Sequence, residues 1–178
     1  IPLTNIIEGG AQERGKRGGT ENTPAIAGMT AALREAVDHM DENMRKVTRL
    51  RETLITGLET IAHARLNGER TQRVPGTVNF CFEGIEGESL LLLLDRKGIA
   101  ASSGSACTSG SLDPSHVLLA LGLPHEVAHG SLRLSVGEYN TDEEMAYIVE
   151  QVRQVVDYLR SISPVWDELE TGVRPHQI

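Results

Sequence analysis

Cysteine and long apolar runs are scarce in this sequence. The 178 residues contain only two cysteines, which excludes a disulfide framework and favours a reducing, cytoplasmic setting. No apolar run is long enough to cross a bilayer, and the first residues lack the basic and apolar stretches of a signal peptide. The sequence does not begin with Met, so we expect the chain to start partway through a longer protein.

Basic residues are also in the minority. Lys and Arg number 17 against 25 Asp and Glu, and the net charge of -8 argues against a nucleic-acid-binding face. The hydrophobic content of 39% is that of an ordinary globular protein, and 178 residues suffice for one domain with its own core.

Helical periodicity dominates two long stretches. Apolar residues recur at helical spacing over residues 23–61, after Thr23 as the expected N-cap and Pro24 as the first helical residue. This pattern is unusually long, and a bend is expected near residues 38–42. A second stretch begins with Thr141 and Glu144, which form a capping box, and continues to residue 162.

Two short segments alternate as strands do. Residues 77–82 place Val78, Phe80 and Phe82 on one face, and residues 131–136 place Leu132 and Leu134 inward with Arg133 on the opposite face. Cys81 then occupies the outer face of its strand and is interpreted as a small structural residue. With a third strand near residue 100, these segments predict an α/β unit whose small sheet packs against the long first helix and the Thr141 helix.

Residues 9–20 form a glycine-rich segment with three cationic side chains and the hydroxyl of Thr20. Many unpaired backbone N–H groups beside positive charge suit a phosphate. The segment nearly matches a nucleotide-binding P-loop, but Arg17 stands where Ser or Thr should bind magnesium, so we predict an anion site only. Residues 1–22 are therefore interpreted as the remnant of a neighbouring domain, and residues 23–178 as a separate small domain.

Residues 102–111, SSGSACTSGS, contain no residue that could fill a core, and Cys107 lies in their middle. Small residues predict an exposed, mobile loop that carries a thiol into a site and out again. A Ser/Gly linker that happens to contain a cysteine is the alternative. Pairing with a histidine base is also conceivable, although nothing in the sequence selects a partner.

Residues 125–129 read HEVAH, a literal HExxH motif. In zinc hydrolases the two His bind the metal from one helix face while the Glu activates water. Here Gly130 and a strand pattern follow at once, which leaves barely one helical turn, so a short surface helix is the competing interpretation.

Three segments together resemble the cysteine desulfurases of the NifS/IscS type. Residues 10–22 are similar to the family's cofactor-phosphate segment, residues 102–111 to its long catalytic loop, and residues 128–135 to its substrate-arginine strand. Their order and spacing match as well. The cysteine segment is similar to the long-loop subgroup, as opposed to the short-loop one.

The resemblance implies a homodimeric pyridoxal 5′-phosphate enzyme of the aspartate-aminotransferase fold that converts L-cysteine to L-alanine. It implies that Cys107 is the nucleophile, takes up sulfur as a persulfide and passes it to an iron–sulfur scaffold or another acceptor protein. Arg133 would hold the substrate carboxylate, and Thr20 would bond the cofactor phosphate of the partner subunit. No resident metal is implied, although Cys107 would meet an iron–sulfur cluster during transfer.

One departure from the family concerns lysine. The family's cofactor lysine follows a histidine in a Ser-Gly-His-Lys-like segment, whereas Lys16, Lys46 and Lys97 are the only lysines here and none lies in such a segment. The aspartate and histidine that hold the cofactor ring are missing too. We therefore expect the C-terminal portion of such an enzyme, inactive alone. The alternatives are a zinc hydrolase using His125, Glu126 and His129, and a non-catalytic sulfur carrier using only Cys107.

Overall fold

The computed structural model describes residues 4–103 and 114–178. The chain divides into two compact units, Ile1–Asp41 and Glu42–Ile178. The predicted division at residue 22 refers to the domains of a complete enzyme and stays a prediction. No helix of the described residues is both long enough and apolar enough to span a membrane.

The first unit contains a short helical turn, α1 (Gln12–Gly15), and the helix α2 (Thr23–Asp38). The turn lies inside the glycine-rich segment, and its residues Glu13 and Arg14 have φ of 51° and 58°, outside helical values. The N-cap of α2 is Asn22, and the expected cap at Thr23 was wrong. The Asn22 Oδ1 accepts a hydrogen bond from the Ala25 N–H at 3.1 Å, and Pro24 follows in the first turn.

The long helical pattern is interrupted where the bend was expected. α2 ends at Asp38, and α3 (Met40–Leu58) begins after His39, whose φ of -106° and ψ of 7° depart from helix. From α3, the residues Leu50, Leu54 and Leu58 are fully buried. Apolar residues thus recur at helical spacing in both helices. Of the two, α3 contributes buried residues to the core and α2 contributes none.

The second unit contains an antiparallel sheet of three strands, β1 (Ala64–Leu66), β2 (Thr77–Phe82) and β3 (Ser131–Ser135), in the order β1-β2-β3. The register pairs Leu66 with Phe80 on one side of β2, and Phe80 with Leu132 on the other. The prediction of a strand near residue 100 was wrong. Ser102 forms only an isolated bridge with Arg133, and the third strand is β1, which is too short to show alternation.

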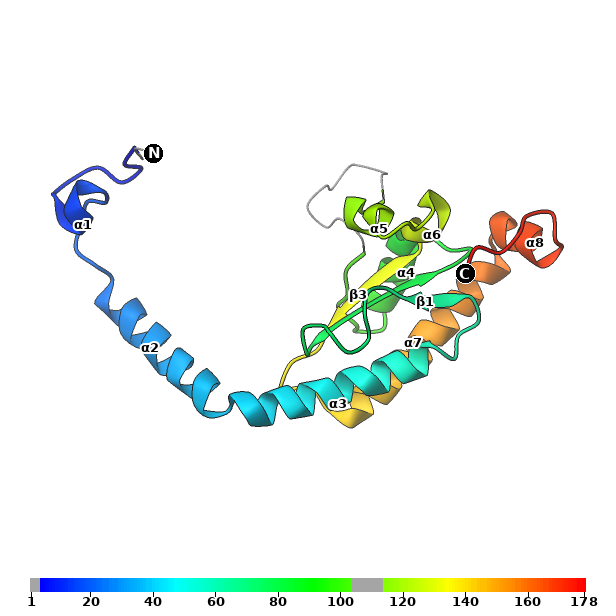
Figure 1. The fold of residues 1–178 in the computed structure, drawn as a ribbon, viewed down its shortest axis with the longest axis horizontal. Helices are drawn as coiled ribbons and strands as arrows, with labels where there is room; N and C mark the ends of the chain where they lie inside the picture. Colours follow the sequence, from blue (N-terminus) through cyan, green and yellow to red (C-terminus); the bar gives the residue numbers. More distant parts are fainter. Residues whose placement is uncertain (1–3, 104–113) are drawn as a thin grey trace. The chain divides into compact units, whose positions relative to one another are not determined.

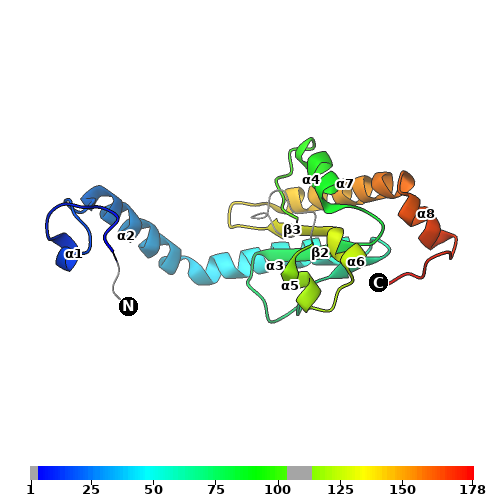
Figure 2. The same ribbon diagram turned by 90° about the horizontal axis from the view of Figure 1, so that it is seen from above.

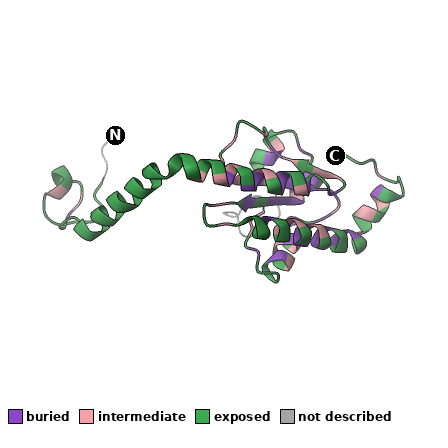
Figure 3. Cartoon of the chain, turned by 90° about the horizontal axis from the view of Figure 1, so that it is seen from below, coloured by how far each residue is buried: buried purple, intermediate pink, exposed green. Residues whose placement is uncertain are grey.

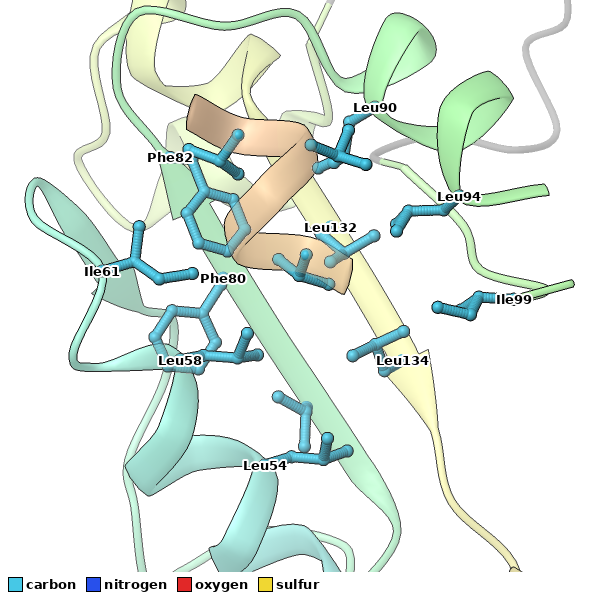
Figure 4. Packing of buried hydrophobic residues seen from close by; sticks show 14 of the residues in the cluster. Leu54, Leu58, Ile61, Phe80, Phe82, Leu90, Leu94, Ile99, Leu132 and Leu134 are labelled. Atoms are coloured by element: carbon cyan, nitrogen blue, oxygen red, sulfur yellow. The ribbon is translucent and has the colours of Figure 1, made fainter. Parts of the chain in front are cut away.

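The core lies on the face of the sheet that carries Val78, Phe80, Phe82, Leu132 and Leu134. Figure 1 shows α3 and α7 (Asp142–Ser161) on this side, and Figure 2 shows α4 (Gly87–Asp95) beside α7. Leucine side chains from α3 and α4 pack in one cluster with the rings of Phe80 and Phe82 of β2 (Figure 4). Burying one such side chain contributes about 1.5–3 kcal/mol, so this layer supplies most of the stabilisation. The predicted packing of a small sheet on two long helices is confirmed, with α3 as the first of them.

The N-terminus of α7 is the capping box expected from the sequence. The Thr141 Oγ1 accepts a hydrogen bond from the Glu144 N–H at 3.3 Å, and the Glu144 Oε2 accepts one from the Thr141 N–H at 3.0 Å. At its other end α7 stops at Ser161, and a further helix, α8 (Pro164–Glu170), follows it. Arg160 of α7 stacks over the Trp166 ring of α8 at 3.9 Å from its centroid.

Within residues 4–103 and 114–178, helices cover the opposite face of the sheet at one end. Two short helices, α5 (His116–Ala120) and α6 (His125–His129), lie over Cys81 and form a second cluster of buried residues (Figure 1). Gly130 joins α6 to β3, and an added Cβ there would lie 2.1 Å from the Phe82 carbonyl oxygen. Only glycine fits so close an approach, and it fixes where β3 begins.

One apolar stripe is left exposed. Along α2 the residues Ile26, Met29, Leu33 and Val37 recur at helical spacing, yet all four are exposed, Met29 by 65% and Leu33 by 61% (Figure 3). Contiguous apolar surface of this kind marks contact sites or drives association.

We expect the isolated 178-residue chain to self-associate through this stripe. In the double variant Met29→Lys/Leu33→Lys, two exposed apolar side chains of α2 become charged, so its sedimentation coefficient should fall toward that of the monomer. The matched control is Ala27→Lys/Ala31→Lys, which adds the same charge to the opposite face of α2 and should leave association unchanged. Equal dissociation of both variants would show that charge, and not the stripe, is responsible.

Candidate functional site

Arg133 lies in the middle of β3 on the face away from the core. Its neighbours in the strand, Leu132 and Leu134, are buried, whereas Arg133 is exposed. Within the part of the chain that the structure describes, its guanidinium makes no hydrogen bond and no ion pair. An exposed guanidinium without a partner among the described residues is available to an anion.

The strand of Arg133 also holds the start of the cysteine segment. The Ser102 N–H donates to the Arg133 carbonyl oxygen at 3.0 Å, and the Arg133 N–H donates to the Ser102 carbonyl oxygen at 2.6 Å. This pairing of Ser102 with Arg133 was not foreseen, because a single bridge leaves no pattern in a sequence.

Cys107 lies outside the described residues, and so does most of its predicted loop. The last described residue before it is Ser103, which directly follows the residue paired with Arg133.

Thr20 belongs to the first unit, whereas Arg133 belongs to the second. The glycine-rich segment folds back on itself, since the Gly18 N–H donates to the Ile7 carbonyl oxygen at 2.9 Å. Arg17 Nη1 donates to the carbonyl oxygens of Gly19 and Thr20, each at 3.1 Å. Among the described residues, the hydroxyl of Thr20 and the backbone N–H groups of Gly19 and Thr20 have no acceptor.

This donor set fits a phosphate group. Phosphate oxygens are bound by unpaired backbone N–H groups, hydroxyls and guanidinium groups. All three are present here, and the Arg17 guanidinium is held beside the others by its hydrogen bonds to the carbonyl oxygens of Gly19 and Thr20. The segment thus supports the predicted anion site.

The HExxH motif forms the single turn α6, and its residues do not come together as ligands. Glu126 is exposed and pairs with Arg174 at 3.1 Å, and His125 is exposed as well. Over residues 4–103 and 114–178, His125, Glu126 and His129 are not among the residues whose donor atoms lie close enough together to hold one metal ion. The structure therefore gives the zinc-hydrolase alternative no support.

The group with metal-ligand spacing is His63, Glu83 and His176, whose donor atoms all lie within 4.8 Å of one another. The two imidazole rings are stacked, with centroids 3.7 Å apart and planes 17° apart, so their in-plane lone pairs cannot converge on one ion. Both rings are also engaged, His176 Nδ1 with the Glu83 Oε2 at 2.8 Å and His63 Nδ1 with the Ile178 carbonyl oxygen at 2.8 Å. We interpret the group as the anchor of the chain's last residues.

Cys81 is the structural residue that the sequence predicts. It is fully buried under α5 and α6, and Asn67 Nδ2 lies 3.2 Å from its Sγ. Burial raises the pKa of the Cys81 thiol, and the Asn67 contact offsets this only in part. A thiolate is the reactive form of cysteine, so Cys81 is inert near neutral pH.

Comparison with known proteins gives a consistent result. The profile of the family described as aminotransferase class-V matches residues 8–148. The chain is 51% identical over 171 residues to a protein named cysteine desulfurase IscS from Clostridium botulinum, and 47% identical over 162 residues to cysteine desulfurase NifS from Azotobacter vinelandii. These matches cover 94% and 90% of the chain.

A solved structure shows the same fold. The NifS-like protein from Rickettsia africae superposes with a TM-score of 0.75 at 30% sequence identity over 88% of this chain. The chain spans only 43% of the length of the Clostridium botulinum protein, 40% of the Azotobacter vinelandii protein and 41% of the Rickettsia africae chain.

We predict that Cys81 does not react with a thiol reagent such as 5,5′-dithiobis(2-nitrobenzoic acid) while the chain is folded. Because its pKa is raised, the thiol stays protonated to higher pH than an ordinary cysteine, and reaction should require unfolding in guanidinium chloride. The variant Cys107→Ser isolates this residue, and Cys81→Ala is the matched control. Rapid labelling of native Cys107→Ser at pH 8 would contradict the buried placement.

Proposed function

Because this chain belongs to the class-V aminotransferase family, we propose that it is part of a pyridoxal-phosphate-dependent cysteine desulfurase. The proposed reaction converts L-cysteine to L-alanine and leaves the sulfur atom on Cys107. The names of the relatives, IscS and NifS, support this choice among the activities of the family.

The observation that carries the proposal is the pairing of Arg133 with Ser102. An exposed guanidinium without a partner among the described residues lies directly beside the residue from which the cysteine segment departs. A group that can bind a carboxylate and the start of the segment that carries the thiol are thus tied to one strand. A non-catalytic sulfur carrier would need Cys107 but not Arg133.

In the proposed role, Arg133 holds the substrate by its carboxylate. Guanidinium and carboxylate form two parallel charge-assisted hydrogen bonds, which fix the direction of the amino acid as well as its position. The exposed side chain on a rigid strand can adopt this arrangement without breaking an ion pair among the described residues. Lys, a single point charge, would hold the carboxylate less well.

Cys107 acts as the nucleophile. Its thiolate attacks the substrate sulfur, a bond forms between the two sulfur atoms, and the bond between the substrate sulfur and Cβ breaks. The electron pair of the broken bond stays with the carbon, which gains a proton to complete alanine. The enzyme retains a persulfide, and its release as sulfide takes two electrons from an added thiol reductant.

The glycine-rich segment would hold the cofactor phosphate. Thr20 is proposed to donate its hydroxyl, together with the N–H groups of Gly19 and Thr20, to the phosphate of the partner subunit's cofactor. Pyridoxal phosphate supplies the electron sink that makes cleavage of the carbon–sulfur bond feasible. Its lysine anchor is proposed to lie in a part of the enzyme other than this chain.

The remaining parts of the proposal concern the assembly. A homodimer would complete each active site with Thr20 from the partner subunit, and an iron–sulfur scaffold or another acceptor protein would take the sulfur from Cys107. We propose that this takes place in the cytoplasm, since the two cysteines form no disulfide framework.

The complete enzyme containing this chain should form alanine and sulfide from L-cysteine in the presence of dithiothreitol, in a 1:1 ratio. Cys107→Ser removes the thiolate and should reduce alanine formation at least a hundredfold, because the chain's other cysteine, Cys81, is fully buried. Cys81→Ala is the matched control and should keep its activity. Alanine formation by the isolated 178-residue chain, or by Cys107→Ser, would refute the assignment.

In the same enzyme, Arg133→Ala should raise KM for L-cysteine roughly 10- to 100-fold, because hydrogen bonds to a charged group contribute about 1.5–3 kcal/mol. Arg65→Ala is the matched control, an exposed arginine on the same face of the sheet, opposite Cys81. Its KM should stay within twofold of wild type. An unchanged KM in Arg133→Ala would remove Arg133 from the substrate site.

A further inference from the structure

The sheet carries a row of polar residues at the level of Arg133. Asn79 pairs with Arg133 across β2 and β3, and Ser102 pairs with Arg133 on its other side. Beyond Asn79, Asn67 donates its backbone N–H to the Asn79 carbonyl oxygen at 2.8 Å. Asn67, Asn79, Arg133 and Ser102 therefore cross the sheet at one level, on the face away from the core.

Exposure increases along this row from Asn67 to Arg133. Asn67 is buried with 8% exposure, Asn79 is half-buried and Arg133 is exposed. Residues directly opposite each other on antiparallel strands have Cβ atoms about 4.5–5.5 Å apart. The Asn79 amide is therefore the polar group of β2 closest to the base of the Arg133 side chain.

A hydrogen bond fixes the orientation of the Asn79 amide. Asn67 Nδ2 donates to the Asn79 Oδ1 at 2.7 Å, so the oxygen end of this amide is directed at Asn67, on the β1 side. The nitrogen end of the same planar group is turned away from Asn67, and the strand order places Arg133 on that side. Among the described residues, Asn79 Nδ2 has no acceptor.

Two groups that only donate hydrogen bonds thus belong to directly opposite residues of neighbouring strands. The amide nitrogen of Asn79 and the guanidinium of Arg133 cannot bond to one another, because neither offers an acceptor. Both can donate to one anion placed between them. Since Arg133 is the proposed carboxylate ligand, the same carboxylate is the anion that Asn79 can reach.

We infer that Asn79 is a second ligand of the substrate carboxylate and acts beside Arg133 on the open face of the sheet. Asn67 is then a positioning residue, because it holds the acceptor end of the Asn79 amide and leaves the donor end for the substrate. The site selects amino acids over amines of the same length. This inference rests on the proposed desulfurase activity, and it extends the site by a residue from β2.

The test uses the holoenzyme of the complete protein and two Asn79 variants. Asn79→Asp keeps an oxygen that can accept from Asn67, but it replaces the donor end with a second acceptor that repels a carboxylate. Asn79→Ala removes both ends. Thr77→Val is the matched control, since Thr77 lies on the same face of β2 but pairs with Ser135.

Two ligands separate substrate binding from a structural effect. KM is measured for L-cysteine, and the affinity for cysteamine, which lacks the carboxylate, is measured by its effect on the cofactor absorbance. We expect Asn79→Ala to raise KM for L-cysteine about 5- to 20-fold and Asn79→Asp to raise it more, because a bond to a charged group is lost. The affinity for cysteamine should stay within twofold in both variants.

Three results would overturn the inference. They are an unchanged KM in Asn79→Asp, an equal loss of affinity for both ligands, or the same effect in Thr77→Val. An equal loss for both ligands is what a purely structural role of Asn79 produces. If instead the wild-type holoenzyme forms no alanine from L-cysteine, the proposed function itself fails, and the inference fails with it.

Discussion

The register between β2 and β3 is the constraint on which the second unit depends. Alternation along each strand sends Phe80 and Leu132 into the core and leaves Asn79 and Arg133 on the other face. A shift of β3 by one residue would bury the guanidinium and expose Leu132 and Leu134. The cost of burying an unpaired charge together with the loss of core contacts makes such a shift prohibitive. The same packing that stabilises the sheet therefore also holds the proposed substrate group outward.

Much of this arrangement could be predicted from the sequence, because it depends on local patterns. Period-two alternation located both long strands, and Thr141 with Glu144 located the start of α7. The break between α2 and α3 was also expected, since a helical pattern of that length seldom remains straight. Each of these signals is contained within a few consecutive residues, and the physical cause acts over the same distance.

The rest could not be predicted, because it depends on contacts between residues far apart in the sequence. β1 has three residues, too few to show a period, and only its pairing with β2 makes it a strand. The contact of His176 with Glu83 spans 93 positions, and no motif announces it. For the candidate site, the alternation within β3 alone was enough to predict that Arg133 faces away from the core. Its polar neighbours Asn79 and Ser102 follow only from the register.

Under the proposed function, the anchoring of the cysteine segment limits where sulfur can be delivered. The segment leaves the sheet at Ser102 and rejoins described structure at Pro114, which is buried and leads into α5. Because Ser102 exchanges two backbone hydrogen bonds with Arg133, the segment that carries the proposed nucleophile begins beside the proposed substrate group. An acceptor protein would therefore have to take the sulfur from the stretch of chain between these two anchors.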